Sequence, residues 1–551
     1  MSEPRDGALV RVLRREPFLI AGVILLAALL RLPDLFGWWL NPDEGIYYGV
    51  VTRDGLGAAW REAMVISHPP LYLVALRAVA WLSTDFVALR SVSFVSGLAA
   101  VYVFVLLGRE AGRTSGGGDV TAGVTGLAAG LLLAVSPRAI ALSQVMRQYA
   151  LLLLVLAAAL LFLLRYLREP STKRLVAYGA CTVVAALLHY STIFALGVFG
   201  ILTLVDGFRR GMGRPAWRRL VVAQAIPALT LIALYFLHLR RIQADLGGHA
   251  LEGWLAGFMI GSPRDAWLAF VGFHSMIAGE MWAAPAAVLT LAAGVWAWKR
   301  ERWSPVLIAA VAGLAIAFAA AALQLYPFGP TRHAVWLLVF VVPLLARAIA
   351  ALTTSGRATL VRALSVAVLL ALGARALRPV LDPEGRPREI SEHVLRMDAV
   401  RAMGEVLDPQ NEPSLVVMST ETYQQLTPLF AEERQTARSS PDGQLLRFAW
   451  GARDVVVLPN RDIAVRPEQL GQANHLYTGV RTAELELGAR IPDVGDPVLV
   501  LAGGWQSRGI EDLVEMANRV GPLGTSTSVP GLIAVYLDFD AYRRALGVQE
   551  G

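Results

Sequence analysis

Long apolar runs recur along the chain from Phe18 to Leu377, and they constrain its fold more than any other feature. Several of these runs approach the ~20 residues that an α-helix needs to cross the hydrocarbon core of a bilayer. Hydrophobic residues make up 55% of the sequence and charged residues only 17%, whereas a soluble protein does not repeat runs of this length so often. The chain is therefore expected to be an α-helical polytopic membrane protein.

The basic residues lie mainly between these apolar runs. The formal net charge is +7, but arginines between membrane spans follow from topology and do not indicate a nucleic-acid partner. Nearly all basic residues are arginines, and Lys173 and Lys299 are the lysines. Because this usage is typical of a GC-rich bacterial genome, we expect a multi-pass protein of the bacterial plasma membrane.

The first apolar run sets the orientation. It covers roughly 17–36 and follows several arginines, so the N-terminus is expected in the cytoplasm as part of an uncleaved anchor. The stretch 69–82 is also apolar, but its length of about 14 residues favours a helix along the outer interface. Treating 69–82 as a span would invert the side of every later basic loop.

We expect about eleven transmembrane helices. They cover approximately 17–36, 87–108, 120–136, 149–165, 175–190, 193–205, 219–237, 281–298, 305–323, 334–350 and 359–377. In this arrangement the loops rich in arginine or lysine all fall on the cytoplasmic side. The outward side receives the loops 37–86, 137–148, 189–192, 238–280 and 324–333.

After Arg378 the composition changes to charged, proline-containing sequence. Strands that alternate with helices predict a small α/β domain with a largely parallel sheet. We therefore expect a transmembrane domain over 1–377, which includes the outer loop 37–86, and a soluble domain over 378–551. The odd number of spans places the soluble domain outside the cytoplasm. Its strands are expected at Leu415–Ser419, Asp454–Leu458, Pro497–Ala502 and Leu532–Leu537, with a helix at Glu511–Val520.

Four outward segments carry side chains suited to catalysis. A carboxylate can take the proton of an attacking hydroxyl, and arginines can hold a departing phosphate. Arg31 in the first span is a further candidate, because charges within a membrane usually face the interior of the bundle. In chain order the four segments contain Asp43 with Glu44, then His68, then Arg147, and then Arg332 with His333.

Each segment also has a plain structural interpretation. The two acids fit an ordinary solvated loop equally well, and His68 fits a simple helix start before Pro69. Arg147 fits an arginine that reaches the lipid headgroups. Positive charge is usually in excess on the cytoplasmic side, so the outward positions of Arg147 and Arg332 are unusual and favour a functional role for both.

Together the segments resemble the GT-C superfamily of glycosyltransferases, in the branch that contains protein O-mannosyltransferases and lipid A aminoarabinose transferases. The resemblance covers roughly residues 10–350 and rests on motifs that occur in the family's order. One departure is Val145, where many relatives have a glutamate. The matching motifs are Asp43-Glu44 with Tyr47, His68-Pro69-Pro70-Leu71-Tyr72 with Ala88-Leu89-Arg90, Ser143-Gln144 with Arg147 and Tyr149, and Arg332-His333.

The resemblance implies an inverting glycosyltransferase. Its donor is a polyprenyl-phosphate-linked sugar carried by a membrane lipid, and its acceptor is a hydroxyl of a glycan, lipid or protein on the outer face. Asp43 is then the catalytic base, and Glu44 shares its motif. No metal or other cofactor is expected, and the single cysteine, Cys181, excludes a thiolate cluster. The residues expected to bind the donor phosphate or sugar are Tyr47, His68, Arg147, Tyr149, Arg332 and His333.

Two other classes of protein stay open. A membrane transporter or lipid flippase typically has internal repeats, broken helices and charges near the bilayer midplane. The sequence shows no repeat, and its notable charges gather at one surface. A non-catalytic scaffold of the cell envelope would be favoured if Asp43 were buried away from any cavity.

Overall fold

The computed structural model describes the residues 16–116, 118–242, 255–354, 394–410, 415–459, 475–490, 497–504 and 526–545. They form two compact units. The described part of the first unit lies within 16–35, 63–78 and 87–354, with gaps at 117 and 243–254. The described part of the second comprises 36–62, 79–86 and the residues from 394 onward. The expected boundary at 377 lies outside the described residues.

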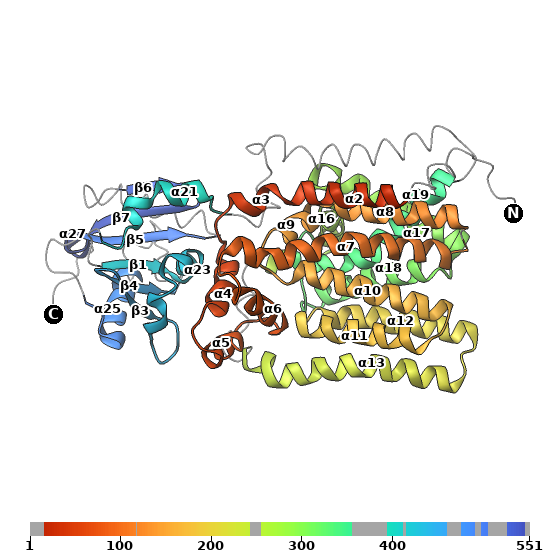
Figure 1. Ribbon diagram of the computed structural model, residues 1–551, viewed down its shortest axis with the longest axis horizontal. Coiled ribbons are helices and arrows are strands. Elements are labelled where there is room, and N and C mark those ends of the chain that lie inside the picture. The colour runs from red at the N-terminus through yellow and green to blue at the C-terminus, as the bar shows by residue number, and fades with distance from the viewer. Residues whose placement is uncertain are drawn as a thin grey trace. The chain divides into compact units, whose positions relative to one another are not determined.

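The first unit is a bundle of helices (Figure 1), as the apolar runs predict. Eight of the described helices are long and apolar enough to cross a membrane, and a ninth span is obtained if α8 and α9 form one broken helix. The principal helices are α2 (Glu16–Arg31), α7 (Phe86–Thr114), α8 (Asp119–Ala134), α9 (Pro137–Ser143), α10 (Tyr149–Arg168), α11 (Thr172–Leu188), α12 (Thr192–Arg210), α13 (Arg214–Leu234), α17 (Glu280–Glu301), α18 (Pro305–Ala322) and α19 (Leu338–Thr354).

Every predicted span within the described residues overlaps one of these helices. α11, at the predicted span 175–190, has 17 residues and is not among the helices that are long and apolar enough to cross a membrane. The last predicted span, 359–377, lies outside the described residues. The expected loop 238–280 contains a helix of its own, α16 (Pro263–Ala278), which packs on α17. Ser262 caps its first turn and Pro263 opens it, so the local sequence carries the start signal of a helix.

The bend between α8 and α9 starts the segment that leads to Arg147. The two helices meet at an angle of 62°. The side chain of Ser136 accepts a hydrogen bond from the backbone of Ala139, and Pro137 occupies the first turn of α9. Because proline has no N–H to continue the previous helix, the chain restarts in a new direction.

The expected interfacial helix is present as α6 (Leu71–Ala80), a short apolar helix of 10 residues. It follows Pro69 and Pro70, and its buried side chains include Tyr72 and Leu76. Its position at a membrane surface and the orientation of the whole bundle stay predictions.

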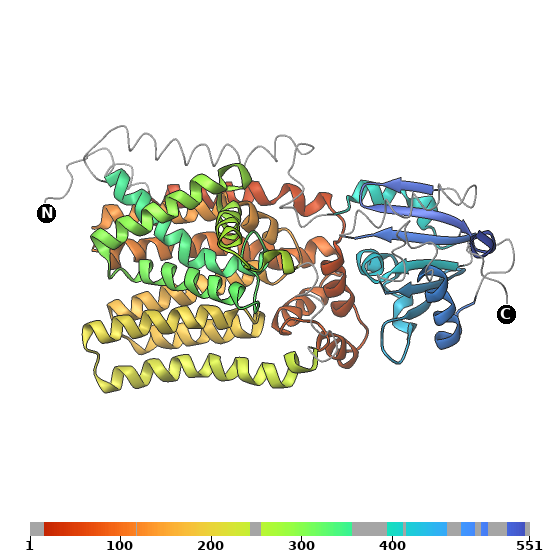
Figure 2. The ribbon, with the colours of Figure 1, turned by 180° about the vertical axis from the view of Figure 1, so that it is seen from behind.

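The second unit contains a seven-stranded sheet in the order β2-β3-β4-β1-β5-β7-β6, which Figure 2 shows from behind. The four predicted strands are confirmed. The prediction of a largely parallel sheet is wrong, because β1 pairs in parallel with β4 and β5 while the other pairs are antiparallel. The strands are β1 (Leu415–Ser419), β2 (Arg438–Ser439), β3 (Leu446–Trp450), β4 (Arg453–Leu458), β5 (Pro497–Gly503), β6 (Ser526–Val529) and β7 (Leu532–Asp538).

Helices complete this α/β unit. α25 (His475–Leu487) and α27 (Phe539–Ala545) contribute Val480 and Tyr542 to a core that they share with alternate residues of the central strands. α23 (Thr420–Leu426) follows β1 directly, with Ser419 as its N-cap. The helix expected at 511–520 lies outside the described residues.

Most of the outer loop also belongs to the second unit. Its helix α4 (Pro42–Val51) and most of α5 (Leu56–Ala63) lie in the segment 36–62, which groups with the C-terminal residues. The expected division instead assigned this loop to the transmembrane domain.

Candidate active site

Three histidines and a tyrosine from four separate segments meet in the first unit. His68 precedes α6, Tyr149 begins α10, His189 follows α11, and His333 lies in the 3-10 helix η3 (Arg332–Leu337). The ring centres of His68 and His189 are 5.2 Å apart, and those of Tyr149 and His189 are 5.3 Å apart. The ring centre of His333 lies 6.3 Å from that of Tyr149 and 6.4 Å from that of His189.

Two arginines give this group of rings its charge. The guanidinium carbon of Arg147 lies 5.7 Å from the ring centre of Tyr149, and Arg147 is only 3% exposed. Desolvation and the positive charge of Arg147 hold the pKa of His68 well below its ordinary value, and Arg332 contributes to the same shift. Desolvation, Arg147 and Arg332 likewise lower the pKa of His189 to about 3. We call the four rings together with the two arginines the cationic cluster.

The protonation states decide what the cationic cluster can bind. His68 and His189 are neutral at neutral pH because their pKa values are depressed, while arginine keeps its charge. A neutral imidazole donates one N–H, and a guanidinium offers a planar fork of donors. Such a set is suited to an anion with several acceptor oxygens, such as a phosphate group.

Hydrogen bonds between helices hold the segment that carries Arg147. The hydroxyl of Ser93 on α7 donates to the backbone carbonyl of Arg147 at 2.9 Å. The hydroxyl oxygens of Ser93 and Tyr72 are 2.7 Å apart, which ties α6 to the same point. The segment that follows His68 and the segment that precedes Tyr149 are thus connected through α7.

Two members of this region are not among the predicted site residues. In the sequence, His189 is only the first residue of the short outward loop 189–192, and Tyr326 only lies within the outward loop 324–333. The ring centre of Tyr326 lies 5.9 Å from that of His333, and its hydroxyl donates to the carbonyl of His333 at 3.4 Å. The signal for His189 is its place at the outer end of a predicted span, beside the other outward segments.

Arg31 is buried in the bundle, as expected, but its role is structural. It is 0% exposed, and its guanidinium donates to Ser143 Oγ at 3.2 Å and to the carbonyl of Ala134 at 3.0 Å. A further bond of 3.3 Å reaches the carbonyl of Leu133. The carbonyl of Leu133 also accepts a hydrogen bond of 3.3 Å from the backbone N–H of Ser136. Arg31 therefore supplies the carbonyl of Ala134, the last of α8, and charge-compensates that helix end.

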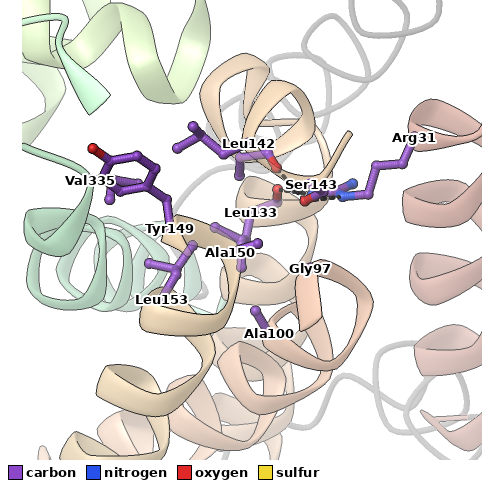
Figure 3. A pocket seen from close by; sticks show the side chains of 11 residues that line it. Arg31, Gly97, Ala100, Leu133, Leu142, Ser143, Tyr149, Ala150, Leu153 and Val335 are labelled. Atoms are coloured by element: carbon purple, nitrogen blue, oxygen red, sulfur yellow. Dashed lines mark hydrogen bonds between the residues drawn. The ribbon is translucent and has the colours of Figure 1, made fainter. Parts of the chain in front are cut away.

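Arg31 and Tyr149 line the same small cavity (Figure 3). The cavity also borders Gly97, where an added Cβ would lie 2.2 Å from Ser143 Oγ. α7 and the end of α9 therefore pack too closely for any larger residue at this position. The tight packing leaves Arg31 engaged with Ser143 and the end of α8.

The two acids of the outer loop lie at the start of α4 in the second unit and differ in environment. Asn41 is the N-cap, and its Oδ1 accepts a hydrogen bond of 2.9 Å from the backbone N–H of Glu44. In return, Glu44 Oε2 accepts a bond of 3.2 Å from the backbone N–H of Asn41. Glu44 is therefore a buried member of a capping box, whereas Asp43 is partly exposed.

α4 packs directly on α23 of the C-terminal region. A Cβ at Gly45 would lie 1.6 Å from the backbone oxygen of Gln424, so only glycine allows this approach. The indole of Trp39 donates to the carbonyl of Gln425 at 2.8 Å and is buried. The C-terminal region therefore covers Trp39.

An ion-pair network extends the same packing along the loop. Arg53 Nε lies 3.0 Å from Glu62 Oε1, and Arg434 lies 3.3 Å from Glu62 Oε2. Arg53 also donates to the backbone carbonyl of Arg434 at 2.7 Å. The segment 36–62 is thus built into the second unit by apolar packing, close backbone approach and paired charges.

The structure places the predicted site residues in two groups. Asp43, Glu44 and Tyr47 lie on α4, where Asp43 and Tyr47 share a helix face by their spacing. Among the described residues, no group of three or more histidine, cysteine or acidic side chains is placed to hold a metal ion. The group in the first unit, which the structure brings together, consists of His68, Arg147, Tyr149, Arg332 and His333.

The bundle and the α/β unit define a multi-pass membrane protein with the GT-C fold. ArnT from Cupriavidus metallidurans in the apo state has a similar structure, with a TM-score of 0.51 and 15% sequence identity over 94% of this chain and 97% of ArnT. ArnT bound to undecaprenyl phosphate gives the same TM-score at 16% identity and the same coverage. The expected fold class is confirmed, as is the resemblance to the GT-C superfamily at the level of fold.

A second solved structure is less similar. The oligosaccharyltransferase of Archaeoglobus fulgidus in the apo form has a TM-score of 0.45 and 12% identity, over 89% of this chain and 69% of that protein. No protein-family model matches the sequence, and no curated protein matches it.

Proposed function

We propose that the protein is an inverting glycosyltransferase that moves a sugar from a polyprenyl-phosphate donor to a hydroxyl acceptor. The observation that carries this proposal is the cationic cluster, in which Arg147 and Arg332 lie among histidines of depressed pKa. ArnT, which shares the fold, has been crystallised with undecaprenyl phosphate. A lipid phosphate is therefore the anion that we assign to the cluster.

The proposed reaction needs a site that holds negative charge on the leaving group. The acceptor oxygen forms a bond to the anomeric carbon while the bond from that carbon to the phosphate oxygen breaks. Polyprenyl phosphate leaves with the electron pair, and the charge that develops on it is stabilised by Arg147 and Arg332. Because attack and departure occur on opposite faces of the sugar, the anomeric configuration inverts.

Asp43 is proposed as the general base that takes the proton of the acceptor hydroxyl. By the resemblance it occupies the position of the family's catalytic aspartate, and its side chain is partly exposed. Glu44 is assigned a positioning role, since its carboxylate is engaged in the capping box. The arginines supply the positive charge in this scheme, so it requires no metal or other cofactor.

The location of the reaction follows from the predicted orientation. We propose that the protein resides in the bacterial plasma membrane, with the outer loop and the α/β domain on the outer face. The acceptor is then a glycan, lipid or protein hydroxyl that reaches this face.

Binding of undecaprenyl phosphate to the purified full-length protein tests the assignment of the cluster. Arg147→Gln and Arg332→Gln should each weaken binding by roughly ten- to a hundredfold, since a charge-assisted hydrogen bond contributes ~1.5–3 kcal/mol. Arg264→Gln is the control, because Arg264 is an exposed arginine in the first turn of α16. Unchanged affinity in both cluster variants would contradict the assignment.

A further inference from the structure

α11 and α13 pack side by side (Figure 1). A groove between them is lined by residues from 175–184 of α11 and from 215–226 of α13. Its volume is about 820 Å³. Val176 and Val183 line it from α11, and Val222 and Ile226 line it from α13. Residues three or four positions apart fall on one face of a helix, so each helix presents one continuous apolar face to the groove.

One end of the groove is basic. Arg218 and Arg219, in the second turn of α13, belong to its lining. Both side chains are exposed, and within the part of the chain that the structure describes neither has a hydrogen bond or an ion pair. The other lining residues are aliphatic residues, glycine and proline. An elongated apolar groove with two available guanidinium groups at one end is complementary to a lipid with an anionic headgroup.

This groove is distinct from the cationic cluster. The cluster member His189 follows the last residue of α11, whereas the groove begins near Leu175 at the first turn. At the rise of an α-helix these two positions are roughly 20 Å apart along the axis. The basic end of the groove and the cluster therefore lie toward opposite ends of α11.

We propose that the groove binds an anionic glycerophospholipid. The phosphate of its headgroup would lie against Arg218 and Arg219, and an acyl chain would lie along Val183 and Ile226. In a bilayer the lipid chains are the molecules available to fill an apolar groove on the helix surface. The two arginines favour an anionic headgroup over a zwitterionic one, because the cationic group of a zwitterionic headgroup offsets the attraction between its phosphate and the guanidinium groups.

Native mass spectrometry of the purified full-length protein tests this proposal. The protein is presented with equal amounts of phosphatidylglycerol and phosphatidylcholine, and the lipids retained are counted. We expect preferential retention of phosphatidylglycerol and a loss of roughly tenfold or more in the Arg218→Gln/Arg219→Gln variant. The matched control is Arg240→Gln/Arg241→Gln, which removes two exposed charges beyond the other end of α13.

A second variant tests the apolar part of the groove. At Gly179 an added Cβ meets no atom within 4 Å, so Gly179→Phe can occupy the groove without a backbone clash. It should reduce phosphatidylglycerol retention although both arginines are present. Gly200→Phe on α12 is its control, since Gly200 is equally free of close neighbours and is not part of the lining.

Three results would overturn the proposal. The first is equal retention of the two lipids by the wild-type protein, and the second is wild-type retention in both groove variants. The third is displacement of phosphatidylglycerol from the groove by equimolar undecaprenyl phosphate, which would assign the groove to the isoprenoid lipid. If the lipid-binding proposal for the groove fails, the binding of undecaprenyl phosphate at Arg147 and Arg332 is unaffected. The experiment therefore distinguishes the lipid-binding proposal from the proposed function.

Discussion

Asn41 and Glu44 form a reciprocal capping box at the first turn of α4. The side chain of Asn41 accepts a hydrogen bond of 2.9 Å from the backbone N–H of Glu44, and the side chain of Glu44 accepts one of 3.2 Å from the backbone N–H of Asn41. This reciprocal pair holds the turn that presents Asp43, which lies between the two capping residues. The adjacent acids Asp43 and Glu44 therefore have different environments, although they are neighbours in the sequence.

The two acids should respond differently to amide substitution. Asp43→Asn removes basicity and should lower the rate of transfer by about 10²–10⁴, as is usual for the loss of a positioned base. Glu44→Gln keeps an acceptor oxygen for the backbone of Asn41, so its effect should be mild. Turnover of both variants, with retained binding of undecaprenyl phosphate as the folding control, checks this prediction. Near-normal turnover of Asp43→Asn with loss of activity in Glu44→Gln would reverse the assignment.

Gly45 should not tolerate even a methyl group. Because the added Cβ of Gly45→Ala would lie 1.6 Å from the backbone oxygen of Gln424, α4 and α23 would have to separate. We expect faster proteolysis of the loop 36–62 in this variant, measured on the full-length protein. Gly57→Ala in α5 is the control, since its Cβ would have only an ordinary contact of 3.6 Å with Arg61. Equal protease resistance in the two variants would contradict the close packing of α4.

Arg31 should contribute to stability and not to donor binding. Arg31→Met removes the side-chain donor to the carbonyl of Ala134 at the end of α8, and a buried acceptor left unsatisfied costs ~1–3 kcal/mol. The apparent melting temperature in detergent should fall, while Arg264→Met should leave it unchanged. A large loss of undecaprenyl phosphate affinity at wild-type stability would show that Arg31 acts on the ligand instead.

The protein should lose stability in mild acid through His189. Burial and the arginines lower its pKa in the folded state to about 3, against about 6.5 in the unfolded chain. The unfolded state then binds more protons between these values, so the stabilisation present above about pH 6.5 is lost as the pH falls toward 3. His189→Gln should therefore lose less thermal stability between pH 7 and pH 5 than the wild-type protein. An equal loss of thermal stability in His189→Gln and the wild-type protein would show that other groups cause the acid sensitivity.

The transmembrane helices could be predicted because each apolar run carries its own signal of length and hydropathy. Strand direction could not, since β3 and β7 owe their antiparallel pairing to contacts with β4 and β5 that no local pattern encodes. The sequence Asn41-Pro42-Asp43-Glu44 does carry the pattern of a capping box, so the role of Glu44 could have been found there. The one sequence signal for His189 is its place at the outer end of a predicted span, and a lone histidine at a helix end has many structural explanations.

Sequence patterns also could not predict that the outer loop packs on the C-terminal region. Gly45 and Gln424 are distant in the chain, and a glycine within a short helix indicates a close approach without naming its partner. The contact depends on the tertiary fold, which determines that α23 presents its backbone oxygen at this position.

The most direct test of glycosyl transfer measures the pool of polyprenyl-phosphate sugars by mass analysis of membrane lipids. In cells without the gene, a polyprenyl-phosphate-linked sugar should accumulate. Wild-type protein should return the pool to its normal level, while Asp43→Asn, produced in equal amount, should not. A pool that is unchanged by deletion, or that Asp43→Asn restores as well as wild type, would contradict glycosyl transfer by Asp43-dependent catalysis.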